Sequence, residues 1–289
     1  MLFRSRYRLI ALDLDGTLLN PDGEVSPANR AAIADAREAG AVVVPCTGRS
    51  WREARLALED VEGLDVGVFV TGATVADLPT GKALDFACFE PHVAHDIVQA
   101  LRQEPESVLV FREFERTGHE YLVTGAGELA PMTRAWFELT GAVVQQQPEV
   151  GIDDLHHCLR VGMITTGDRV GELVDSLRDR CGDRALVHSF CAIHQPESRQ
   201  SLHILEAFAA GVDKWRGVKF LADRHGIAAD EVACLGDEIN DLSMLEAAGL
   251  GVAMDNAIDA AKTRADRVTR SHADDGVAFA IRQMLDGVW

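Results

Sequence analysis

The stretch 8–20, RLIALDLDGTLLN, decides how the rest of the chain is interpreted. Its apolar run is typical of a buried strand, and Asp13 and Asp15 stand at the end of that run. The Asp-Gly pair that follows, set between apolar residues, is a strong signal for a β-hairpin turn. Two aspartates at the end of a strand are equally typical of an active site. The stretch alone leaves both interpretations open.

Both ends of the chain alternate short apolar runs with amphipathic segments, which indicates an α/β fold with a parallel sheet covered on both faces. Ser26 and Pro27 are placed to begin one helix, and Ser50 and Glu53 have the spacing of a capping box. The expected strands are 8–14, 41–46, 66–72, 232–236 and 251–254, and the expected helices are 26–40, 50–60, 214–226, 240–249 and 276–285.

The middle of the chain differs from both ends, because strand candidates there outnumber helices. The expected strands are 108–113, 120–125, 158–165 and 202–208, and the expected helices are 92–101 and 170–180. This composition predicts an α+β domain of residues 86–208, inserted between the two halves, 1–85 and 209–289, of one α/β domain. The polar stretch 194–201 is the most loop-like.

The charge of the chain excludes some classes of partner. Its 289 residues include 46 acidic and 28 basic side chains, for a net charge of −18. Nucleic-acid binding calls for clustered Lys and Arg, so we expect no nucleic-acid partner. The six cysteines form no Cys-x-x-Cys pair, which favours reduced thiols over a disulfide framework or a zinc site. We recognise no signal peptide or membrane span, and expect a cytoplasmic protein. The sequence carries no signal for an oligomeric state.

Polar residues follow the expected strands at the sheet edge where α/β proteins bind ligands. They are Asp13 and Asp15 after the first strand, Thr47, Gly48 and Arg49 after the second, Thr71 and Gly72 after the third, and Asp237, Asn240 and Asp241 after 232–236. Singly, each could serve a turn or a helix start, and Lys214 could be a surface lysine. Together, carboxylates about 4 Å apart repel by roughly 4 kcal/mol, so the cluster needs a cation. Ligands that are all oxygen favour Mg²⁺.

Four segments, in order along the chain, resemble the motifs of the haloacid dehalogenase-like (HAD) superfamily of phosphohydrolases. They are DLDGTLL at 13–19, TGR at 47–49, Lys214, and GDEINDLSML at 236–245. The tail 252–281 is similar to the Cof-type branch, subfamily IIB. The resemblance implies a Rossmann-like, doubly wound core of residues 1–85 and 209–289, with a C2B-type α+β cap domain at 86–208.

The resemblance also implies a chemistry: Mg²⁺-dependent hydrolysis of a small phosphomonoester, such as a sugar phosphate or a phosphorylated cofactor or metabolite, through a covalent aspartyl-phosphate. Asp13 would be the nucleophile and Asp15 the general acid/base, since residues two apart on an extended strand share a face. Mg²⁺ would be held by Asp13, the main-chain carbonyl of Asp15 and Asp237, with Asp241 as a further ligand or a support. The resemblance further implies that Thr47, Gly48 and Lys214 hold the phosphoryl oxygens, with Asn240 as a neighbour of the site.

The sequence departs from the family pattern in two places. Relatives often have Asn-Gly-Ala after the third strand, whereas this chain has Thr-Gly-Ala at 71–73, which predicts an altered polar contact. The bulky Trp215 follows Lys214 where a small residue is usual, which predicts a narrower site or a changed cap closure. Neither change touches the nucleophile, the acid or the metal ligands, so we expect activity to be retained.

Three other interpretations stay open at this point. Capped relatives include phosphomutases, and the core motifs do not separate these from phosphatases. A sensor of phosphorylated ligands could keep the fold and lose turnover, although Asp13 and Asp15 are both present. The segment GAGELA at 125–130 fits a Gly-x-Gly-x-x-Ala dinucleotide pattern, but it lies in the expected cap rather than in the first strand–helix turn.

Overall fold

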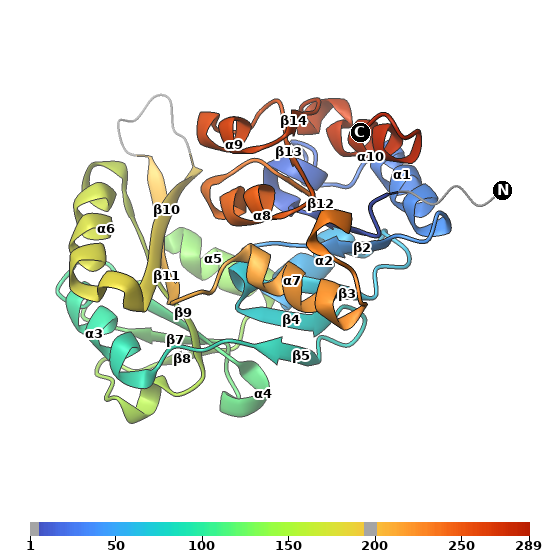
Figure 1. The fold of residues 1–289 in the computed structure, drawn as a ribbon. Coiled ribbons are helices and arrows are strands. Elements are labelled where there is room, and N and C mark those ends of the chain that lie inside the picture. The colour runs from blue at the N-terminus through green and yellow to red at the C-terminus, as the bar shows by residue number, and fades with distance from the viewer. Residues whose placement is uncertain (1–5, 194–200) are drawn as a thin grey trace. The chain divides into compact units, whose positions relative to one another are not determined.

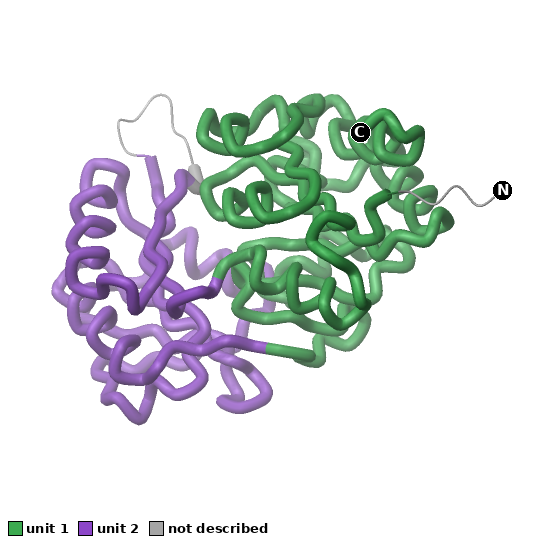
Figure 2. Tube along the Cα trace, in the orientation of Figure 1, with its two compact units in different colours: residues 1–85, 213–289 green, residues 86–212 purple. Residues whose placement is uncertain are grey.

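The structure, a computed structural model, describes residues 6–193 and 201–289. The chain divides into two compact units (Figure 2), which we call the core unit, residues 1–85 and 213–289, and the inserted unit, residues 86–212. The inserted unit extends to Val212 and includes the whole of strand β11 (Leu202–Ala209). The loop expected at 194–201 lies, except for Ser201, outside the described residues.

The core unit is built on a five-stranded parallel sheet (Figure 1). Its strands are β1 (Leu9–Leu12), β2 (Val42–Pro45), β12 (Val232–Gly236), β13 (Leu250–Ala253) and β14 (Arg267–Val268). They lie in the order β14-β13-β12-β1-β2. Leu9 of the central strand β1 lies opposite Val232 on one side and Val42 on the other. All four residues of β1 are buried, as its apolar sequence predicts for a strand covered on both faces.

Helices cover this sheet in two layers. They are α1 (Pro27–Glu38), α2 (Trp51–Leu58), α7 (Lys214–Arg224), α8 (Leu242–Ala247), α9 (Asp259–Arg264) and α10 (Gly276–Leu285). The steps from β1 to β2 and from β12 to β13 run in opposite directions across the sheet. Right-handed crossovers therefore place α1 and α8 on opposite faces. The sheet is doubly wound, and its direction of winding changes between β1 and β12, where such folds bind ligands.

Two helix starts follow the expected capping rules. The Ser26 hydroxyl accepts the N–H of Asn29 at 3.1 Å, and Pro27 is the first residue of α1. Ser50 and Glu53 form a capping box at α2, in which the N–H of Ser50 donates to the Glu53 carboxylate at 2.8 Å. These bonds satisfy N–H groups that have no partner within a helix, and they confirm both predicted starts.

The third expected strand pairs differently from the prediction. Strand β3 (Val66–Phe69) touches β2 through one parallel bridge, between Cys46 and Val68. It then pairs antiparallel with β4 (Thr74–Asp77), and with β5 (Ala83–Phe86) these strands form a separate three-stranded sheet. The expected strand 66–72 therefore ends at Phe69, because the chain turns back at 70–72, and the sequence analysis did not predict β4 and β5.

The inserted unit is an α+β fold with a six-stranded sheet of order β10-β11-β9-β6-β7-β8. Besides β11, its strands are β6 (Val108–Arg112), β7 (Tyr121–Thr124), β8 (Val144–Gln146), β9 (Cys158–Thr166) and β10 (Ala185–Ile193). Its helices are α3 (Pro91–Leu101), α4 (Phe114–Thr117), α5 (Pro131–Thr140) and α6 (Gly167–Cys181). The apolar faces of α3 and α6 share one buried core with the sheet. The sequence analysis missed β10, whose apolar pattern is interrupted by His188 and Ser189.

Among the helices of the described residues, none has both the length and the apolar character needed to cross a bilayer.

Candidate active site

The opening aspartates lie where the winding of the sheet changes direction. The N–H of Asp13 donates to the carbonyl of Leu235 in β12 at 3.0 Å, which ties the end of β1 to its neighbour. The chain then makes a tight turn over Leu14–Leu18, with Gly16 at φ +76°. A β-carbon on Gly16 would lie 2.2 Å from a carboxylate oxygen of Asp237. The Asp-Gly pair therefore makes a turn that packs against the acid cluster, and it is not the tip of a hairpin.

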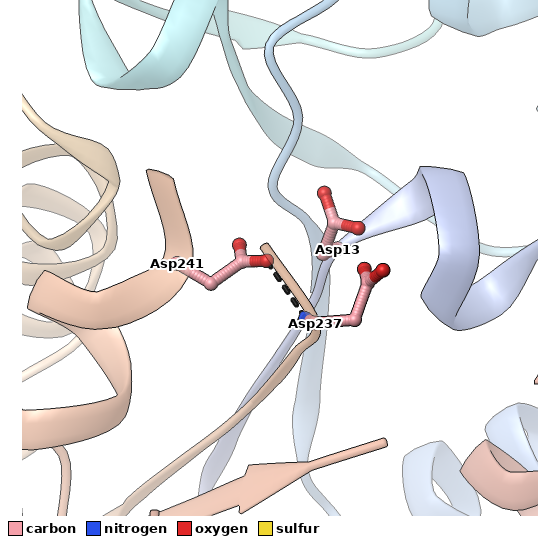
Figure 3. Close-up of side chains that lie close together, drawn as sticks. All are labelled: Asp13, Asp237 and Asp241. Atoms are coloured by element: carbon pink, nitrogen blue, oxygen red, sulfur yellow. Dashed lines mark hydrogen bonds between the residues drawn. The ribbon is translucent and has the colours of Figure 1, made fainter. Parts of the chain in front are cut away.

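Three carboxylates converge at this edge of the core sheet (Figure 3). Asp13, Asp237 and Asp241 each offer an oxygen, and these atoms lie within 4.8 Å of one another. Asp241 is buried, and its Oδ2 accepts the N–H groups of Asp237 and Glu238, both at 2.9 Å. The Thr17 hydroxyl donates to Oδ1 of Asp237 at 2.9 Å. A cluster of oxygen donors alone, with no nitrogen or sulfur donor, fits Mg²⁺.

Among the described residues, Lys214 is the one buried basic side chain that pairs with this cluster. Lys214, the first residue of α7, is 0% exposed, and its Nζ lies 2.6 Å from Oδ1 of Asp13 and 2.5 Å from Oδ1 of Asp241. Burial alone would lower the pKa of Lys214, but Asp13 and Asp241 raise it well above its ordinary value. The ammonium group is therefore charged at neutral pH.

One ammonium group does not balance three carboxylates. Burial is the main cause that raises the pKa of Asp13 well above its usual range, with Lys214 opposing and the other acids reinforcing the shift. Burial, and next the charge of Asp241, raises the pKa of Asp237 to about 7. Burial and the neighbouring acids both favour the neutral forms, and a divalent cation would favour the charged ones.

Asp15 lies apart from this cluster. The prediction that it shares a face with Asp13 assumed a continuing strand, but β1 ends at Leu12 and Asp15 falls in the turn. Its side chain is 58% exposed and forms a two-pronged ion pair with Arg49, in which Nε of Arg49 donates to Oδ2 at 2.8 Å and Nη2 pairs with Oδ1. The sequence analysis placed Arg49 after the second strand but assigned it no role. The spacing of residues along the chain does not predict an ion pair that forms across a turn.

The segment after β2 brings Thr47 and Gly48 to the same region of the core unit. The buried Thr47 hydroxyl accepts the N–H of Arg49 at 3.1 Å, and its own proton can be donated to a ligand. Asn240 lies in a short turn, Ile239–Asp241, and its Nδ2 approaches Gly48. Trp215 is partly exposed, and its effect on the site stays a prediction.

The Gly-x-Gly-x-x-Ala segment at 125–130 has a packing explanation. A β-carbon on Gly127 would lie 2.2 Å from the carbonyl oxygen of Pro105, so a close approach of two loops requires glycine there. The Ser107 hydroxyl donates to the carbonyl of Gly127 at 2.7 Å. Glu106 and Glu128 border the same loops, and carboxylates there disfavour a pyrophosphate.

Comparison with known proteins agrees with the fold and the motifs. Residues 10–281 match the family model of haloacid dehalogenase-like hydrolases. The chain is 30% identical to the 5-amino-6-(5-phospho-D-ribitylamino)uracil phosphatase YwtE of Bacillus subtilis, over 97% of this chain and 99% of that protein. A haloacid dehalogenase-like hydrolase from Bacteroides thetaiotaomicron is 25% identical, with a TM-score of 0.73 over 96% of this chain and 99% of that one.

A sugar phosphatase of HAD subclass IIB has the same fold, with a TM-score of 0.75 at 19% identity over 98% of this chain and 100% of that one. The family match spans nearly the whole chain, and the likeness to the subclass IIB structure includes the inserted unit. The chain therefore belongs to the haloacid dehalogenase-like hydrolases, as a phosphatase of their Cof-type branch.

Proposed function

We propose that the protein hydrolyses a small phosphomonoester in a Mg²⁺-dependent reaction, through a covalent phospho-aspartate on Asp13. The observation that carries the proposal is the convergence of Asp13, Asp237 and Asp241 around the buried ammonium group of Lys214. The substrate class follows from the relatives, one of which is named as a phosphatase of a phosphoribitylamino-uracil and another as a sugar phosphatase. A sugar phosphate or a sugar-alcohol phosphate is the substrate class that we propose.

In the proposed reaction Asp13 attacks phosphorus and the ester oxygen leaves. Lys214 holds Oδ1 of Asp13, so we assign the attack to Oδ2. Lys214, the Thr47 hydroxyl and the Gly48 backbone would neutralise charge on the phosphoryl oxygens, which is the main task in this chemistry. Mg²⁺, held by Asp13, Asp237 and Asp241 with the Asp15 carbonyl, would share that task.

Asp15 is the proposed proton carrier. It would donate a proton to the leaving oxygen and later take one from the water that attacks the phospho-aspartate, which restores Asp13 and releases phosphate. Because Arg49 pairs with the Asp15 carboxylate, Arg49 must move away before Asp15 can contact the leaving oxygen. Asn240 is proposed as a neighbour that contacts the bound phosphoryl group.

A direct test measures phosphate release from p-nitrophenyl phosphate with Mg²⁺ and with EDTA. We expect turnover only with Mg²⁺, and we expect Asp13→Asn to lower kcat by about a thousandfold or more, because the nucleophile is lost. Asp22→Asn, at an exposed turn, is the matched control and keeps full turnover. Wild-type turnover in Asp13→Asn contradicts the assignment of the nucleophile.

A further inference from the structure

The turn at 70–72 has an unusual backbone for its sequence. Val70 and Thr71 both have positive φ, 51° and 53°, although both are β-branched. β-branched residues rarely adopt this left-handed conformation, because Cβ crowds the backbone. Such outliers concentrate at functional sites, where the surrounding structure holds them in place.

The surrounding hydrogen bonds hold this turn firmly. The N–H of Val70 donates to the carbonyl of Arg49 at 2.9 Å, and the N–H of Thr71 donates to the carbonyl of Thr47 at 3.0 Å. Arg216 donates to the carbonyl of Gly72 at 2.9 Å. The turn is thereby fixed to the segment after β2 on one side and to α7 on the other.

The Thr71 side chain has no structural partner to explain it. Thr71 is 0% exposed, and its hydroxyl oxygen has no hydrogen-bond partner among the described residues. A buried hydroxyl without a partner is unfavourable, and valine would fill the same space without that cost. The hydroxyl is therefore available to donate a hydrogen bond to a ligand.

The Thr71 hydroxyl lies near Gly48, on the side where a β-carbon of residue 48 would point. Its Oγ1 is 3.4 Å from the point where a β-carbon on residue 48 would lie, and Nδ2 of Asn240 is 3.6 Å from the same point. Two groups that can donate protons, from separate segments of the core unit, thus converge beside Gly48. Converging donors fit a ligand that accepts hydrogen bonds, such as a tetrahedral oxyanion.

We propose that the Thr71 hydroxyl donates a hydrogen bond to an oxygen of the phosphoryl group bound over Gly48. The inference rests on the proposed function, and it adds Thr71 to the residues that hold the phosphoryl oxygens. The left-handed backbone at 71 aims the hydroxyl at this space, and the bound oxyanion supplies the partner that the folded chain lacks.

The test measures binding of inorganic phosphate by calorimetry, in excess Mg²⁺, to the full chain and to two variants. In Thr71→Val, which keeps the side-chain shape, we expect phosphate to bind about tenfold or more weakly, as for the loss of a hydrogen bond to a charged group. The melting temperature of the free variant should equal or exceed that of the wild type, because an unpaired hydroxyl is gone. Thr71→Ser keeps the hydroxyl and should bind phosphate nearly as the wild type does.

The matched control is Thr74→Val, since the Thr74 hydroxyl is also buried without a partner but belongs to β4. We expect unchanged phosphate binding in this variant. If Thr71→Val does not fold, Thr71→Ser and Thr71→Ala, which differ by one hydroxyl, make the same comparison. Wild-type affinity for phosphate in Thr71→Val or Thr71→Ala overturns the inference and leaves the proposed function intact. A wild-type protein that neither binds phosphate nor hydrolyses phosphomonoesters overturns both.

Discussion

Two buried charge clusters in the described part of the chain are balanced in opposite ways. In the core unit, Asp13, Asp237 and Asp241 share the single ammonium group of Lys214. In the inserted unit, one carboxylate, Glu206 of β11, has a guanidinium group and an imidazole beside it. The first cluster has a surplus of negative charge, and the second has none.

The cluster in the inserted unit is built across adjacent strands. Nη1 of Arg160, on β9, lies 2.5 Å from Oε1 of Glu206, and its Nη2 donates to the Tyr121 hydroxyl at 3.0 Å. His188, on β10, is the partner of Glu206 in the strand register, with Nε2 3.5 Å from Oε2. Burial alone would raise the pKa of Glu206, but Arg160 and His188 outweigh it and lower the pKa.

The contrast shows what each cluster is for. Where the chain supplies its own counter-charge, as at Glu206, the pKa of the buried acid falls and the charges stabilise the fold. Where the counter-charge falls short, as at Asp13 and Asp237, burial and then the neighbouring acids raise the pKa values, and the fold retains repulsion that an external cation would relieve. Surplus charge at the edge of the core sheet thus indicates a binding site, and balanced charge indicates a structural element.

Replacing Lys214 is the most sensitive test of the difference between the two clusters. Lys214→Met leaves Asp13 and Asp241 buried without their cation, so we expect the free energy of unfolding of the metal-free protein to fall by about 3–5 kcal/mol. Urea unfolding in EDTA measures the loss, and added Mg²⁺ should restore part of it. The control Lys219→Met removes an exposed pair with Asp223 and should change stability by less than about 1 kcal/mol. Equal losses in both variants would contradict a special role for Lys214.

Neutralising Glu206 tests the balanced cluster. Glu206→Gln removes the buried carboxylate that pairs with Arg160 and His188, so we expect a loss of about 3 kcal/mol at pH 7, in EDTA and in Mg²⁺ alike. Because folding lowers the pKa of Glu206 from its ordinary value of 4.5, its contribution is present above that pH and is lost as pH falls through the folded-state value. Urea unfolding should therefore show a smaller difference between wild type and variant near pH 4. A stabilising effect of Mg²⁺ on this variant alone would argue against the distinction between the clusters.

The sequence predicted the core fold because its signals there are local. The apolar run of β1 and the caps at Ser26 and Ser50 act within a few residues, and the structure has each of them. The sequence also predicted that Asp13 and Asp237 lie at neighbouring strand ends, because the carboxyl ends of parallel strands lie at one edge of the sheet.

Other features depend on geometry that the sequence does not carry. The ion pair between Asp15 and Arg49 depends on the turn after β1. The alternation of side chains along an extended strand, from which the position of Asp15 was predicted, does not hold in a turn. The cluster around Glu206 needs the register of β10, whose pattern is interrupted at His188. The left-handed backbone of Thr71 is set by hydrogen bonds to the segment after β2, and no local signal marks it.

The two clusters should also differ in how the free energy of unfolding of the metal-free protein depends on pH, although this effect is smaller. Folding raises the pKa of Asp237 from 3.8 to about 7, so between these values the folded state binds a proton that the unfolded state has lost. Stability must then fall as pH rises from about 4 to 7 and level off above that range. This direction is opposite to the one that Glu206 causes.

Asp237→Asn isolates this effect, because an amide does not titrate. In EDTA we expect the variant to melt about 2–4 °C above the wild type at pH 8, and we expect the difference to shrink toward pH 5. This shift corresponds to a change of roughly 1 kcal/mol in the free energy of unfolding, which is modest because Asp237 keeps some contact with water. In excess Mg²⁺ the order should reverse at pH 8, because the cation stabilises the wild-type carboxylate and the variant offers it one ligand fewer. Melting curves that are parallel across this pH range, with or without Mg²⁺, would show that the acids of the core unit are as well balanced as Glu206.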